Sequence, residues 1–192
     1  MLTLTPQEEQ ATIRQAKADR QQFRPVYRAY VERIYSYVAY RVSNQQDAED
    51  IVSKVFIKAL YKLDQYDERY PFGAWLFGIA RNTIIDHYRR NDRQPDIIPF
   101  PETPSIADDH SPEAMLSDQE RAEQMRAYIA NLSRRRQEVV TLRFYAGMPN
   151  KEIAELLDLD ERTIASHLSR ALTDLQTMID KETSDEQLRS NA

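Results

Sequence analysis

Apolar residues that recur at steps of three and four predict helices over most of the chain. In the first half such stripes run over residues 27–42, 51–63 and 74–88. Asp47 is placed to cap the second of these helices, and Pro71 suits the first turn of the third. Three amphipathic helices with short connections predict a compact helical bundle.

A second set of helices is predicted after residue 118. Apolar stripes run over residues 125–132 and 134–145, and a short helix over 150–157 is followed by a helix from Glu161. The residues expected to cap or end these helices are Ser133, Gly147 and Asp160. Two helices joined by a turn of three or four residues predict a helix-turn-helix.

Composition agrees with an all-α fold. Only three glycines are present, and no Asn-Gly or Asp-Gly pair marks a tight hairpin. Glycine-rich nucleotide-binding loops are missing, and a chain without cysteine has no disulfide, thiolate metal site or cysteine nucleophile. No secretory signal opens the sequence and no apolar run of about 18 residues crosses a membrane, so we expect a soluble cytoplasmic protein without a cofactor.

Charge and proline divide the chain. The net charge is −5, but residues 92–118 alone hold seven acidic groups against one basic group, together with five prolines. Prolines this closely spaced prevent a persistent helix, so we expect an acidic linker there. The predicted organisation is a helical domain over residues 1–91, the linker, a helix-turn-helix domain over residues 119–182 and a frayed tail over residues 183–192.

The third predicted helix combines aromatic and basic side chains. Its candidates for DNA contact are Trp75, Arg81, Asn82, Arg89 and Arg90. Aromatic faces that stack on bases, beside cations that hold phosphates, are what single-strand binding requires. The competing interpretation is that Trp75 belongs to the core and that the cations form a solvated face.

The last predicted helix presents a polar face. Arg162, Ser166, Ser169 and Arg170 would face outward on the second helix of the helix-turn-helix, where they would reach the DNA major groove. Enzyme function is not indicated, because the three histidines stand singly and none has a metal-binding or catalytic spacing. We therefore expect no catalytic residues and no metal ligands.

Three segments in chain order resemble the extracytoplasmic-function (group IV) sigma factors of bacterial RNA polymerase. The matching stretches are DAEDIVSKVF at 47–56, FGAWLFGIARN at 72–82 with DHYRR at 86–90, and LRFY at 142–145 with KEIAELL at 151–157 and TIASHLSRA at 163–171. The resemblance covers about residues 12–90 and 119–178.

The resemblance implies a promoter-specificity subunit. It implies that Asp47, Glu49, Asp50 and Phe56 dock on core RNA polymerase, that the third helix melts and reads the −10 element, and that the last helix reads the −35 element. Because most members of the family are held inactive by an anti-sigma protein, the resemblance implies such a protein as a further partner. The alternative left open is a dimeric helix-turn-helix regulator that binds a palindromic duplex without being a polymerase subunit.

Several positions depart from the family pattern. Ser53-Lys54 stands where the family usually has Gln-Glu, and Asp158 replaces its usual turn glycine. Ala165 and His167 replace two cations of the recognition helix. Two fewer cations predict weaker DNA binding with a flatter salt dependence.

Overall fold

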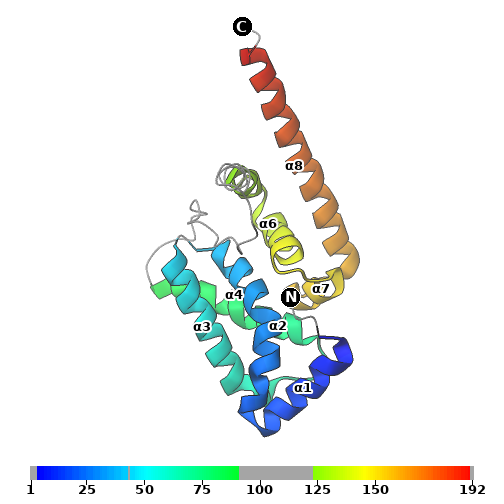
Figure 1. Ribbon diagram of the computed structural model, residues 1–192. Helices are drawn as coiled ribbons and strands as arrows, with labels where there is room; N and C mark the ends of the chain where they lie inside the picture. The colour runs from blue at the N-terminus through cyan, green and yellow to red at the C-terminus, as the bar shows by residue number, and fades with distance from the viewer. Residues whose placement is uncertain (1–3, 43, 91–122, 191–192) are drawn as a thin grey trace.

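The structure, a computed structural model, describes residues 4–42, 44–90 and 123–190, and no strand occurs within these ranges. The all-α prediction is therefore confirmed, while the predicted linker at 92–118 lies outside the described residues. The N-terminal bundle (Figure 1) contains α1 (Pro6–Ala18), η1 (Arg20–Phe23), α2 (Arg24–Ala39), α3 (Gln45–Lys62), η2 (Leu63–Gln65) and α4 (Phe72–Arg90). The C-terminal bundle contains a helical stretch at 123–130, then α6 (Arg134–Val140), η3 (Thr141–Tyr145), α7 (Asn150–Leu157) and α8 (Glu161–Ser190).

The core of the N-terminal bundle forms where α2, α3 and α4 meet. The predicted stripes point inward, and Ile34, Ile51 and Val55 are fully buried. Tyr37 of α2 meets Phe77 of α4 edge to face, with ring centroids 5.4 Å apart. This interlocking of aromatic and branched side chains fixes the position of α4, which carries the candidate single-strand residues.

The first helix, α1, was not among the sequence predictions. It begins after Thr5, whose hydroxyl accepts the Glu8 N–H while the Glu8 carboxylate accepts the Thr5 N–H. Ile13 and Ala16 are its two fully buried residues. The short apolar stripe explains why periodicity missed this helix, although the Thr-x-x-Glu capping box marks its start.

Two predicted helix starts shift by a few residues. Asn44, not Asp47, caps α3, because Asn44 is extended and its Oδ1 accepts the Asp47 N–H at 2.7 Å. Asp47 is the third residue of the helix and accepts a hydrogen bond from the Asn44 amide. Pro71 lies just before α4, where its carbonyl accepts the Trp75 N–H.

The predicted helix-turn-helix is present as α7 and α8. Asp158 ends α7 in the left-handed conformation at φ 54°, and the Leu159 N–H then donates to the Ala154 carbonyl. Asp160 caps α8 as predicted, since its Oδ1 accepts the Thr163 N–H at 2.7 Å. This turn sets the angle at which α8 leaves α7.

The connection between α6 and α7 differs from the uniform helix predicted over 134–145. The last five residues form the π-helical turn η3, after which Gly147 turns the chain at φ 64° as the sequence predicted. Ser133 stands at the cap position of α6 without a side-chain cap bond. In addition, α8 continues to Ser190 where the sequence predicted a frayed tail, and its end projects away from both bundles (Figure 1).

The two bundles pack against each other. Helix α4 lies along α7, and α2 contacts η3. Tyr40 of α2 and Tyr145 of η3 stack at a tilt with ring centroids 4.7 Å apart. The candidate DNA-contacting helices α4 and α8 therefore belong to bundles that touch.

Candidate functional site

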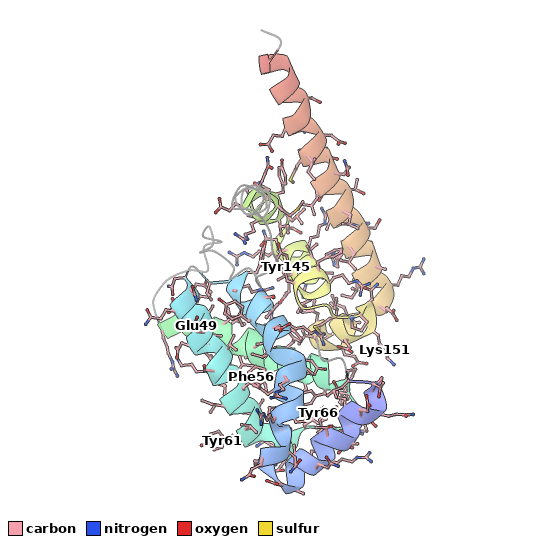
Figure 2. All side chains as sticks on the ribbon, in the orientation of Figure 1. Glu49, Phe56, Tyr61, Tyr66, Tyr145 and Lys151 are labelled. Atoms are coloured by element: carbon pink, nitrogen blue, oxygen red, sulfur yellow. The ribbon has the colours of Figure 1, made fainter. Side chains whose placement is uncertain are left out.

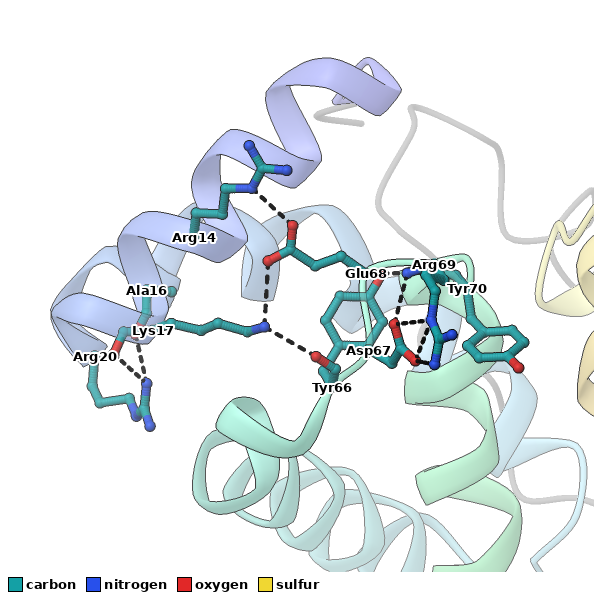
Figure 3. A network of polar contacts seen from close by, with 9 residues as sticks. All are labelled: Arg14, Ala16, Lys17, Arg20, Tyr66, Asp67, Glu68, Arg69 and Tyr70. Atoms are coloured by element: carbon teal, nitrogen blue, oxygen red, sulfur yellow. Dashed lines mark hydrogen bonds and ion pairs between the residues drawn. The ribbon is translucent and has the colours of Figure 1, made fainter.

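A rigid loop at residues 66–71 leads into α4. From α1, the Lys17 ammonium donates to the Tyr66 carbonyl at 3.0 Å and pairs with the Glu68 carboxylate (Figure 3). Arg14 also donates to Glu68, at 2.8 Å. Within the loop, the Arg69 guanidinium holds the pKa of the Asp67 carboxyl at about 2 through hydrogen bonds. These contacts fix the approach to the aromatic start of α4.

Trp75 belongs to an aromatic cluster. Its ring centroid lies 5.3 Å from those of both Tyr66 and Phe72, and it is half-buried. Burial raises the pKa of the Tyr66 hydroxyl to about 12, so that group is a neutral donor to the Tyr70 carbonyl. Trp75 thus combines a core role with one partly open side, and Tyr70, five residues earlier, is exposed.

The other α4 candidates lie in two environments. Asn82, Arg89 and Arg90 are exposed, and the two arginines form the last turn of the helix. Arg81 is half-buried, and its Nε donates to Oε1 of Glu138 from α6 at 2.7 Å. One predicted DNA-binding cation, Arg81, is therefore paired with a carboxylate of the C-terminal bundle.

The predicted polymerase-docking residues of α3 also differ in exposure. Glu49 (Figure 2) and Asp50 are both exposed on α3. Asp50 pairs with Lys54 one turn later. Asp47 is half-buried, and one of its carboxylate oxygens lies 3.6 Å from Nε2 of His87 on α4. Asp47 therefore also joins α3 to α4.

Phe56 is almost fully buried, and its ring meets that of Tyr27 from α2 edge to face at 4.7 Å. Phe56 thus supports this surface from beneath. Sequence reasoning missed the apolar side chains that do reach solvent, Tyr27, Ile57 and Tyr61, of which Tyr61 is 83% exposed (Figure 2). Ile57 and Tyr61 are four residues apart and follow the Asp50–Lys54 pair along one side of α3, a spacing that could have revealed them.

The outward face of α8 agrees with its predicted register. Its four polar candidates are all exposed: Arg162, Ser166, Ser169 and Arg170. Ile164 and Leu168 point into the core between them. The polar face of α8 is therefore exposed along the helix that follows the capped turn.

Cations from α6 extend this face. Burial, followed by the nearby Arg135, Arg136 and Arg170, lowers the pKa of His167. Arg136 also pairs with Asp174 of α8. The sequence signal for this addition is the triple arginine at 134–136, at the start of the helix predicted over 134–145.

A cavity of about 550 Å³ lies at the junction of the bundles. Its walls include Tyr30 and Arg33 from α2, Tyr70 from the loop, and Lys151 and Glu152 from α7. Burial raises the pKa of the Glu152 carboxyl, and the charge of Arg33 opposes that rise. Both charge signs line the cavity, beside the exposed ring of Tyr70.

Within the described ranges, no three His, Asp or Glu side chains gather as a metal site would require. In the same residues, no helix combines the length and apolar character needed to cross a membrane.

Two family models match the chain. One, described as sigma-70 region 2, covers residues 26–94, and the other, sigma-70 region 4, covers residues 122–175. Together they span more than half of the chain and correspond to the two bundles.

Curated relatives match across both bundles. The ECF RNA polymerase sigma factor BldN of Streptomyces coelicolor is 28% identical over 158 residues, a match that covers 82% of this chain and 60% of BldN. The RNA polymerase sigma factor YlaC of Bacillus subtilis is 29% identical over 164 residues, covering 85% of this chain and 95% of YlaC.

One solved structure, sigma factor RpoE in complex with the anti-sigma factor NepR from Bartonella quintana, shares the fold. Its TM-score is 0.61 at 23% identity, and the match covers 83% of this chain and 98% of that chain.

Proposed function

The chain belongs to the sigma-70 family, in its extracytoplasmic-function group, and on that premise we propose that it is the promoter-specificity subunit of a bacterial RNA polymerase. The proposal rests foremost on the exposed polar face of α8, set by the capped turn after α7. The chain would recruit core polymerase to −35 and −10 elements. Nucleotidyl transfer would belong to the polymerase, so the chain would not itself be an enzyme. It would act where the polymerase acts, in the cytoplasm.

The C-terminal bundle would bind the −35 element. Arg162 and Arg170 would contact phosphates or base edges, and Ser166 and Ser169 would approach the groove. Arg135 at the start of α6 adds a cation beside this face. Ala165 and His167 leave the helix itself short of charge, so we propose modest upstream affinity with a shallow salt dependence.

The N-terminal bundle would open the −10 element. Trp75 and Asn82 would meet unpaired bases, while Arg81, Arg89 and Arg90 would hold the backbone of the single strand. A base accepted outside the stack is selected for sequence and keeps the duplex open, so recognition and melting would occur together.

The exposed side of α3 would dock on polymerase. Glu49 and Asp50 supply negative charge, while Ile57 and Tyr61 supply the apolar contact area that a stable interface needs at its centre. Asp47 and Phe56 would hold this surface in shape from within the bundle. The proposed domain boundaries remain residues 1–91, 92–118, 119–182 and 183–192.

Transcription from a pool of promoter fragments, by core bacterial polymerase with and without the protein, tests the proposal. Specific transcripts are expected only with the protein, and their start sites locate both elements. Ala165→Lys with His167→Arg should tighten upstream binding and steepen its salt dependence, because each cation adds a phosphate contact. Exposed Thr177→Lys on α8, beyond the recognition face, is the control.

An absence of transcripts, with salt-sensitive binding of the free protein to a palindromic duplex, would instead support the dimeric regulator. An anti-sigma partner is proposed because the RpoE structure contains one, named NepR. Copurification of a small partner that blocks transcription is the corresponding test.

A further inference from the structure

Helix α1 lies outside both segments matched by the family models, and it is anchored at both ends. Near its start, the Glu9 carboxylate accepts the hydroxyl proton of Tyr30 from α2 at 2.6 Å. Just after its end, Arg20 pairs with Asp64 of η2 at 2.6 Å. One side of the helix is buried between these two anchors. A helix held in this way presents its other side chains at fixed positions to the loop at 66–71.

The side chain of Lys17 on α1 makes three contacts with this loop (Figure 3). Its ammonium donates to the Tyr66 carbonyl at 3.0 Å and pairs with the Glu68 carboxylate at 3.3 Å. The same ammonium lies over the Tyr66 ring, 5.4 Å from the centroid. With 25% of the Lys17 side chain exposed, water competes only in part for these contacts. Lys17 therefore holds both the backbone and the ring of Tyr66.

Tyr66 in turn contacts the aromatic start of α4. Its ring centroid lies 5.2 Å from that of Phe72 and 5.3 Å from that of Trp75, and its hydroxyl donates to the Tyr70 carbonyl at 2.6 Å. Phe72 is buried in the core, whereas Trp75 is half-buried with one side open. Because close-packed rings cannot turn independently, the orientation of Trp75 depends on that of Tyr66.

Arg14 of α1 offers a comparison within the same network. Its side chain is 66% exposed, and its contact within the described residues is with the Glu68 carboxylate. Exposed ion pairs of this kind contribute little to stability. Lys17 differs because it also binds the carbonyl and the ring of Tyr66. The two cations therefore separate an effect on the loop carboxylate from an effect on the aromatic cluster.

We propose that Lys17 is a positioning residue for capture of the single strand. Acting through Tyr66, it holds Trp75 in the orientation in which its open side receives an unpaired base. The cost of ordering the ring is then met on folding and not on binding, which favours association. The role in capture rests on the proposed function, in which Trp75 meets bases of the −10 element, whereas the link from Lys17 to Trp75 does not.

Fluorescence tests the link in the protein without DNA, because Trp75 is the only tryptophan of the chain. Lys17→Met removes the ammonium and keeps the length of the side chain, so the fast component of the Trp75 anisotropy decay should increase. Lys17→Arg keeps a cation over the Tyr66 ring and should restore the wild-type decay. Arg28→Met, at an exposed cation of α2, is the control and should leave the decay unchanged.

Strand binding is measured on polymerase assembled with each variant. Affinity for a single-stranded −10 oligonucleotide, taken from the mapped promoter, should fall about threefold to tenfold in Lys17→Met, as expected for partial loss of the stacking of one base. Lys17→Arg should recover it, and binding of an upstream duplex should be unchanged in both variants. Arg14→Met should affect the anisotropy decay and the strand affinity less than Lys17→Met does. Circular dichroism verifies that every variant is folded.

An unchanged Trp75 decay in folded Lys17→Met would overturn the link, whatever the protein does in transcription. A changed decay with unchanged strand affinity would overturn the positioning role alone. Equal effects of Arg14→Met and Lys17→Met would also overturn it, because the loop carboxylate and not Tyr66 would then carry the effect. Failure of the proposed function is seen separately, as an absence of transcripts with the wild-type protein and core polymerase.

Discussion

Asp158 sets the turn of the helix-turn-helix at a backbone cost. It is the one non-glycine residue with positive φ in the described part of the chain, at 54°. The left-handed conformation costs an L-residue about 1 kcal/mol or slightly more, which glycine does not incur. Glycine offsets about 0.5 kcal/mol of this gain in stability, because its unfolded chain has greater conformational freedom. Asp158→Gly should therefore raise the free energy of unfolding by about 0.5 kcal/mol.

A substitution series separates this strain from a charge effect. Asn tolerates the left-handed region as well as Asp does, so Asp158→Asn should be near neutral. Asp158→Ala lacks the short polar side chain that eases this conformation, so it should lose about 0.5 kcal/mol. The readout is native-state exchange of the Leu159 amide, which donates to Ala154 across the turn. Glu155→Gln, an exposed change on α7, controls for loss of an acidic charge. Equal protection in the Ala and Gly variants would refute the strain argument.

Three further predictions concern single side chains. The fully buried Tyr37 hydroxyl has no hydrogen-bond partner among the described residues, so Tyr37→Phe should stabilise the N-terminal bundle by about 1 kcal/mol, measured by urea unfolding followed through the fluorescence of Trp75. The lowered pKa of His167 means that the folded state favours the neutral ring; unfolding should become easier as the pH falls through about 6.5, and His167→Gln should reduce this slope in calorimetry. Glu68→Gln removes the carboxylate that binds two α1 cations, so amide exchange at residues 66–70 should accelerate about threefold or more; unchanged exchange would contradict the role given to α1.

Periodicity predicted most of the fold because each helix buries one stripe. It also placed Phe56 inside the bundle, where the structure buries it. The family resemblance placed the same residue among the polymerase contacts, which remains a prediction. The exposed Tyr61, in the last turn of the same helix, was missed because the stripe that periodicity reveals is the buried one, and the four-residue spacing of Ile57 and Tyr61 was not used. Sequence patterns thus located α3 and its buried stripe, but they did not separate the residues that support its surface from those that form it.

The contact between the bundles could not be read from the chain. Arg81 and Glu138 are 57 residues apart, and the segment between them includes the predicted linker, which carries no periodic signal. Each residue alone has the pattern of a solvated helix surface. Their pairing depends on how two separately folded bundles meet, which local propensity does not determine.

The two proposed DNA-binding faces differ in how far they are exposed. The face of α8 is fixed by its own turn and is exposed while the bundles touch, whereas Arg81 is engaged by Glu138. A duplex would therefore meet an exposed face on α8, whereas a single strand would have to compete with Glu138 for Arg81. Polymerase bound to the exposed side of α3 would contact a helix whose main neighbours are α2 and α4. We therefore expect replacement of Glu138 by Gln to affect binding of a single strand more than binding of upstream duplex.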